Sequence, residues 1–221
     1  MKNAKKGLLI SSLLFLAFVL WTVIVMYVDV GMIGADGTSV GLSTLNGYVH
    51  SQTGVNFALY DMTDVLSSLP LMICVGFGAL GLFQLIKRKR ISAVDGDIIC
   101  MGVFYVTVIG VFLFFENFTV NYRPVLIEGQ LEVSYPSSTT LLVMCVVPSA
   151  VIWSYRRIQN KILKNTFVCL GALFTAFMVV CRLVSGVHWF TDIVGGILIS
   201  ASLVTLYGTV SDLMLKNHIG R

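Results

Sequence analysis

Apolar residues fill six long stretches of the chain that contain no charged side chain. A helix that crosses the hydrocarbon core of a membrane needs about 20 mostly apolar residues, within a range of about 17–25. All six stretches meet this requirement, and the pattern therefore predicts six transmembrane helices. The stretches are 7–28, 65–86, 98–115, 133–155, 165–181 and 193–211.

A seventh uncharged stretch, 37–60, is too polar to span a membrane, because its hydroxyl and amide groups would lack partners in lipid. Two apolar patterns with helical spacing lie in or near it. Two short helices on the outer membrane surface would explain them, and an ordinary folded loop over 30–64 would do so equally well. The patterns are Leu42, Leu45 and Val49, then Val55, Leu59 and Met62.

The composition and the start of the chain agree with a membrane protein. The chain is 57% hydrophobic and only 12% charged, about half the charged fraction of a soluble domain. The first apolar stretch follows three lysines, as a signal peptide does, but it is longer than a signal peptide core and lacks a clear cleavage site. We expect an uncleaved anchor within one all-α membrane domain, 1–221.

The basic residues predict the orientation of the chain. With six spans, 13 of the 15 lysines and arginines fall on one side, which the positive-inside rule assigns to the cytoplasm together with both termini. The other two, Arg123 and Arg182, fall on the outer side, where each is expected to have a specific anionic partner. The 13 are Lys2, Lys5, Lys6, Lys87, Arg88, Lys89, Arg90, Arg156, Arg157, Lys161, Lys164, Lys216 and Arg221.

Three polar segments are predicted to meet on the outer side. Arg123 offers a fork of donors that suits phosphate oxygens, and Pro136 followed by two serines predicts a helix start with free N–H groups. His188 and Asp192 are four residues apart and share a helix face, so the carboxylate can hold one ring nitrogen and leave the other as a nucleophile. Each feature alone is common in a structural role. Together they indicate a phosphate site.

These segments resemble the signature motifs of the type 2 phosphatidic acid phosphatase family, the lipid phosphate phosphatases. The spacing Arg182-x5-His188-x3-Asp192, within Ser185 to Gly196, is similar to the third motif. Arg123-Pro124 matches the end of the first motif, and Pro136-Ser137 matches the start of the second. The resemblance covers roughly residues 60–210 and includes the order of the motifs and the six spans.

The resemblance implies a mechanism and the roles of the residues. His188 would attack phosphorus and become a phosphohistidine, and Asp192 would orient it. The phosphoryl oxygens would be held by Arg123, Ser137, Ser138 and Arg182. No metal or other cofactor is implied. The implied substrate is a lipid phosphate or a polyprenyl diphosphate at the outer face of the bilayer, and no nucleic acid partner is expected.

Three positions depart from the family pattern. Glu116 stands where the family has a phosphate-binding lysine, and Ser138 and Thr139 replace the Gly and His of the second motif. We expect Glu116 to turn away from the site or to pair with Arg123 or Arg182. The replaced histidine protonates the leaving group in the family, and here Thr139 or His50 could substitute for it. The alternative is a family member that binds lipid phosphates without turnover.

The orientation can be tested with a membrane-impermeant thiol reagent in a cysteine-free background. Pro124→Cys should be labelled in intact cells, and Lys89→Cys should be labelled only after the cells are broken open. Labelling of position 124 only in broken cells would refute the predicted topology.

Overall fold

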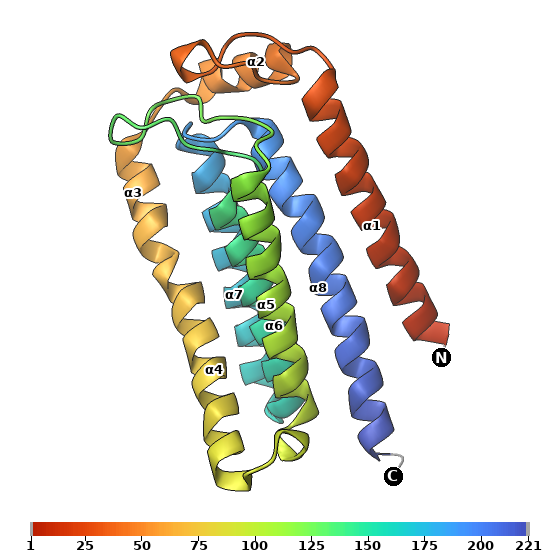
Figure 1. Ribbon diagram of the computed structural model, residues 1–221. Coiled ribbons are helices and arrows are strands. Elements are labelled where there is room, and N and C mark those ends of the chain that lie inside the picture. Colours follow the sequence, from red (N-terminus) through yellow and green to blue (C-terminus); the bar gives the residue numbers. More distant parts are fainter. Residues whose placement is uncertain (1, 220–221) are drawn as a thin grey trace.

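The computed structural model describes residues 2–219, with side chains for residues 3–215, and this part is almost entirely helical (Figure 1). Within it, six helices are long and apolar enough to cross a membrane, where α3 and α4 count as one span. The predicted all-α fold with six spans is confirmed. The helices are α1 Lys2–Tyr27, η1 Ala35–Gly37, α2 Ser43–Thr53, α3 Phe57–Leu66, α4 Ser68–Arg88, η2 Ile91–Ala93, α5 Gly96–Asn117, α6 Ser138–Arg157, α7 Lys161–Val184 and α8 Phe190–Ile219.

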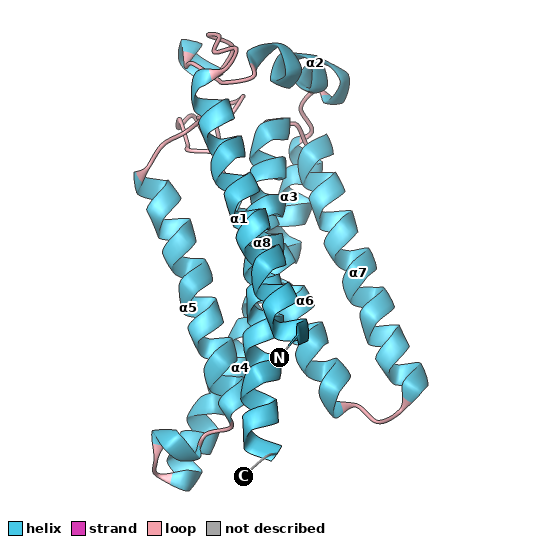
Figure 2. Ribbon diagram, turned by 90° about the vertical axis from the view of Figure 1, so that its right-hand side faces the viewer, coloured by secondary structure: helices cyan, strands magenta, loops and turns pink. Residues whose placement is uncertain are grey.

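The helix α8 is central to the bundle and packs against α1, α5 and α6 (Figures 1 and 2). Small residues let α1 approach it closely. Ser11 Oγ donates to the carbonyl of Ser202 at 3.0 Å, and Ser202 Oγ donates back to the carbonyl of Ser11 at 2.9 Å. Hydroxyl bonds between close-packed small residues are a common way to join helices in lipid, where hydrophobic burial drives little association.

The two ends of the bundle differ. The helix α2 and the segments 118–137 and 185–189 lie at one end, which we call the site end, and both termini of the described chain point toward the other (Figure 1). Ion pairs hold that opposite end: Arg88 Nη1 lies 2.6 Å from Asp95 Oδ1, and Arg157 Nη2 lies 2.6 Å from Asp97 Oδ2. These pairs join α4, α5 and α6. The side chains of Lys2, Lys216 and Arg221 lie outside the described residues.

The segment between the first two spans is helical, but only one of its two helices is a separate surface element. The helix α2 lies across the site end, whereas α3 stacks on α4 to form one apolar column, 57–88 (Figure 1). Of the two alternatives for 30–64, a pair of separate short helices is not found, because α3 continues into the second span. Ser67 explains the continuity, because its αR conformation closes α3 and opens α4 with little change of direction.

A polar residue docks α2 onto the bundle. The Asn46 side chain is fully buried, and it donates to Thr191 Oγ1 at 3.0 Å and accepts from the Thr191 backbone N–H at 3.2 Å. The predicted apolar stripe is only partly buried: Leu42 packs against the hydrophobic core, whereas Leu45 is 38% exposed. A side-chain amide satisfies both a buried donor and a buried acceptor, and this makes it a specific anchor.

Gly186 sets how closely the chain before α3 can approach the turn between α7 and α8. Its φ is +67°, and a Cβ at this position would lie 1.7 Å from the carbonyl oxygen of Gly54. The carbonyl of neighbouring Ser185 accepts a bond from the N–H of Asn56 at 2.9 Å, which requires the close approach. Only glycine meets both conditions without strain.

We therefore expect Gly186→Ala to destabilise the protein by about 1–3 kcal/mol, the usual effect of overpacking. Thermal unfolding in detergent measures this change. Gly102→Ala is the matched control, because an added Cβ there meets nothing within 4 Å. Equal melting temperatures for the two variants would show that the contact with Gly54 does not limit the packing.

Candidate active site

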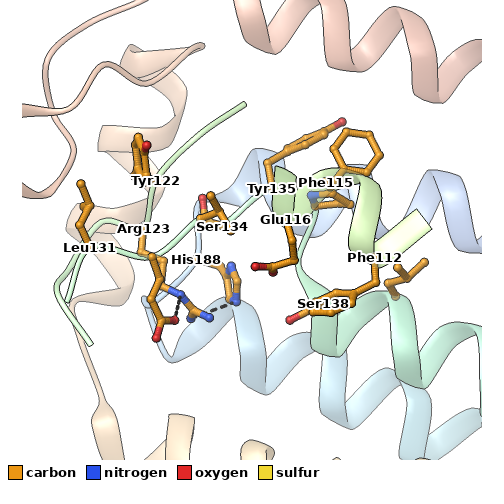
Figure 3. A pocket seen from close by; sticks show the side chains of 14 residues that line it. Phe112, Phe115, Glu116, Tyr122, Arg123, Leu131, Ser134, Tyr135, Ser138 and His188 are labelled. Atoms are coloured by element: carbon orange, nitrogen blue, oxygen red, sulfur yellow. Dashed lines mark hydrogen bonds and ion pairs between the residues drawn. The ribbon is translucent and has the colours of Figure 1, made fainter. Parts of the chain in front are cut away.

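A cavity of about 460 Å³ opens at the site end of the bundle. The end of α5, the segment 118–137, the start of α6 and the turn between α7 and α8 contribute to its wall (Figure 3). Three of the polar side chains that face it come from different parts of the chain: Arg123, Ser138 and His188. The fold thus brings together residues from all three segments singled out in the sequence.

The imidazole of His188 lies in the wall of this cavity and is only 3% exposed. Its Nε2 lies 3.3 Å from Arg123 Nη1. A guanidinium can only donate, so Nε2 must accept and carries no proton. The proton then resides on Nδ1, which lies 3.7 Å from Asp192 Oδ2. The unprotonated nitrogen is therefore Nε2, which lies at the cavity and accepts from Arg123.

The surroundings of His188 keep its ring neutral. Burial lowers the pKa of His188 well below its usual value of 6.5, and the nearby charges of Arg123 and Arg182 lower it further. A neutral imidazole is the nucleophilic form, because the protonated ring has no lone pair to offer.

Asp192, in the first turn of α8, is fully buried and fixes the turn that carries His188. Its Oδ2 accepts from the backbone N–H of Trp189 at 2.9 Å, and its Oδ1 accepts from Asn121 Nδ2 at 3.3 Å. Trp189 Nε1 in turn donates to the carbonyl of Tyr122 at 2.8 Å. These bonds tie the turn between α7 and α8 to the segment that precedes Arg123.

The two arginines predicted for phosphate occupy different positions. Arg123 lines the cavity, and its Nε lies 3.0 Å from Glu132 Oε2. Arg182 is 1% exposed and lies behind the cavity wall, where Nη1 donates to Thr63 Oγ1 at 3.0 Å. Both guanidinium groups lie over the ring of Tyr60. The distance from Cζ to the ring centroid is 5.7 Å for Arg123 and 4.4 Å for Arg182.

The start of α6 presents one of its serines to the cavity. Ser138 lines the wall, while Ser137 is fully buried as the N-cap and accepts from the N–H and the hydroxyl of Thr140. Thr139 points instead into a separate apolar cavity between α4, α5 and α6. The hydroxyl of Ser137 is thus occupied in capping, and a bound phosphate would meet Ser138.

Neither expected substitute for the missing acid reaches the cavity. Thr139 faces away, and the ring of His50 packs against Trp189 with a centroid separation of 5.4 Å. Burial lowers the pKa of His50 below its usual value. Among the described side chains, no group of three or more His, Cys, Asp and Glu is placed to hold a metal ion.

The expectation that Glu116 turns away or pairs with an arginine is wrong. Its side chain lines the same cavity as His188 and Ser138 (Figure 3). Arg123 has Glu132 as its partner, and the carboxylate near Arg182 is that of Asp64, at 4.0 Å. Glu116 lies in the last turn of α5, and its side chain is exposed next to buried Phe115, which lines the same cavity.

Sequence reasoning missed three residues that hold the site together: Asn46, Tyr60 and Thr63. Their signal was weak, because single polar residues in a mixed segment are common at surfaces. Asn121 belongs to the segment that the sequence places at the site together with Arg123, but the sequence assigned it no role. Asn46 and Thr191 are 145 residues apart in the sequence, so no local sequence pattern predicts their contact.

Comparisons with known proteins agree with this architecture. A model of the PAP2 superfamily matches residues 72–213. A solved structure of a transmembrane PAP2-type phosphatidylglycerolphosphate phosphatase from Bacillus subtilis matches with a TM-score of 0.62 and 16% identity, over 90% of this chain and 94% of that one. At this identity the likeness shows the fold. A search of curated proteins finds no match.

The buried neutral imidazole predicts a pH effect on stability. Below about 6.5 the unfolded chain binds a proton at His188 that the folded protein does not bind, so stability falls as the pH falls, by up to about 1.4 kcal/mol per pH unit. The wild type should therefore lose more thermal stability between pH values of about 7.5 and 5 than His188→Gln does. His50→Gln is the control and should show a smaller difference, because His50 is only partly buried. Equal losses in wild type and His188→Gln would contradict a depressed pKa.

Proposed function

Because this chain belongs to the PAP2 superfamily, we propose that it is a membrane lipid phosphate phosphatase that works through a phosphohistidine at His188. Its substrate is a lipid phosphate or a polyprenyl diphosphate, and its site lies on the outer face. The distribution of basic residues supports this orientation, since 13 of the 15 fall on the other side of the predicted topology.

The observation that carries the proposal is the state of His188. Its unprotonated Nε2 lies at the cavity and accepts from Arg123 Nη1 at 3.3 Å, while Nδ1 faces the buried carboxylate of Asp192. The two groups are 3.7 Å apart, and a small approach of the ring on phosphate binding would let Asp192 orient the nucleophile. An entering phosphate would draw Arg123 to its oxygens and release Nε2 for attack.

The cavity also supplies groups that fit a phosphate. Arg123 offers a planar fork of donors, Ser138 offers a hydroxyl, and the positive end of α6 points toward the same space. In the first step Nε2 forms a bond to phosphorus and the bond to the leaving oxygen breaks. In the second step water attacks phosphorus, the bond to Nε2 breaks, and inorganic phosphate leaves.

A second cavity supports a substrate with lipid tails. It has a volume of about 290 Å³, lies between α4, α5 and α6, and is lined mostly by apolar side chains. It shares Phe112, Ser138 and Leu141 with the cavity that contains His188. A headgroup at His188 can therefore keep its tails beside the membrane-facing helices.

The proposal is tested by phosphate release from the purified protein in detergent, with a lipid monophosphate and a polyprenyl diphosphate as substrates. We expect release by the wild type, none above background by His188→Ala, and most of the activity in His50→Ala, whose histidine lies outside the cavity. Acid-labile labelling of the wild type by ³²P-substrate would trap the phosphohistidine. Release at background level by wild type and His188→Ala alike would favour the alternative, a protein that binds lipid phosphates without turnover.

A further inference from the structure

The proposed reaction leaves one proton unassigned, the one that the leaving oxygen requires. We propose that Glu116 supplies it as the general acid of the first step and takes a proton from water in the second. This inference rests on the proposed function and identifies a catalytic residue for it. It places an acid at the position where the family pattern has a lysine.

The position of Glu116 is the first support. The residue lies in the last turn of α5, and its side chain lines the same cavity as the imidazole of His188 (Figure 3). Ser138, the phosphate ligand at the start of α6, faces the same space. A phosphoryl group between Nε2 and Ser138 would therefore have Glu116 within the same cavity.

The other titratable groups of the cavity are already engaged or unsuitable. Glu132 is the ion-pair partner of Arg123, at 3.0 Å. The Tyr135 hydroxyl is 2.7 Å from Thr22 Oγ1, and burial raises its pKa. Tyr122 is a phenol, a much weaker acid than a carboxyl group. The titratable side chains that line the cavity are Glu116, Tyr122, Arg123, Glu132, Tyr135 and His188.

Glu116 is free of the ion pairs that engage other carboxylates. It is next to the last residue of α5, and its side chain is exposed. Among the described residues, no basic side chain lies within 4.0 Å of its carboxylate, whereas Glu132 is paired with Arg123. Its carboxyl group can therefore approach a bound leaving group without breaking an ion pair.

The proton balance closes over one cycle. In the first step His188 Nε2 bonds to phosphorus, the bond to the lipid oxygen breaks, and the Glu116 carboxyl gives its proton to that oxygen, so that the lipid leaves as an alcohol. In the second step water attacks phosphorus while the Glu116 carboxylate takes a proton from it. The bond between phosphorus and Nε2 breaks, and both residues return to their starting state.

The dependence on the leaving group tests the proposal. A lipid alkyl phosphate needs a protonated leaving oxygen, whereas nitrophenolate leaves from p-nitrophenyl phosphate without a proton. In a single turnover, Glu116→Gln should release lipid alcohol about 10²–10⁴-fold more slowly than wild type, the usual contribution of general acid catalysis. Its release of nitrophenol should stay close to wild type, which also shows that the variant is folded. Glu116→Asp keeps the acid and should recover part of the alkyl rate.

Glu132→Gln is the matched control, because it removes a carboxylate from the same cavity but one that is paired with Arg123. It should alter the rates for both substrates together. If Glu116→Gln slows both substrates equally, or slows neither, the acid role is overturned while the proposed function stands. If wild type and His188→Ala are equally inactive on both substrates, the proposed function fails and the acid role fails with it.

Discussion

Two buried positive charges share one aromatic ring, and the organisation of the site depends on this constraint. Arg123 and Arg182 both lie against Tyr60, although like charges at short range repel each other strongly away from water. Glu132 beside Arg123 and Asp64 near Arg182 offset this repulsion, and Thr63 accepts a hydrogen bond from Arg182. Burial is the main cause of the lowered pKa of His188, and the charges of the same two arginines lower it further. The negative charge of a bound phosphate would reduce the repulsion between the two arginines further.

Composition and charge were enough to predict the spans, because burial in lipid imposes a length and excludes charged side chains. The pair of His188 and Asp192 was also predictable, since a spacing of four residues fixes a shared helix face. Neither the docking of α2 nor the direction of Glu116 could be predicted. Helical periodicity reports which face is apolar, but Asn46 docks through a polar contact with a residue far along the chain. The direction of Glu116 depends on the register at which α5 ends, and boundaries are the least reliable part of a sequence prediction.

The comparison with the Bacillus subtilis structure shows that two chains with few identical residues can adopt this fold. The two chains share a fold at 16% identity. Most membrane-facing positions need only be apolar, as the exposed leucines, valines and phenylalanines of α1, α4 and α7 illustrate. The end of the bundle that holds Arg123, His188 and Asp192 is built instead from buried polar side chains that bond to one another.

The part of the chain before the family match is physically continuous with the site. The match begins at residue 72, yet Tyr60 and Thr63 hold the arginines, and Asn46 and Trp21 both bond to Thr191, next to Asp192. A shortened version that began at residue 72 would expose Arg182 and leave Thr191 without two of its partners. The smallest unit that can be transplanted, redesigned or fused to another protein therefore includes α1, α2 and α3. A boundary drawn from family resemblance alone would divide the site.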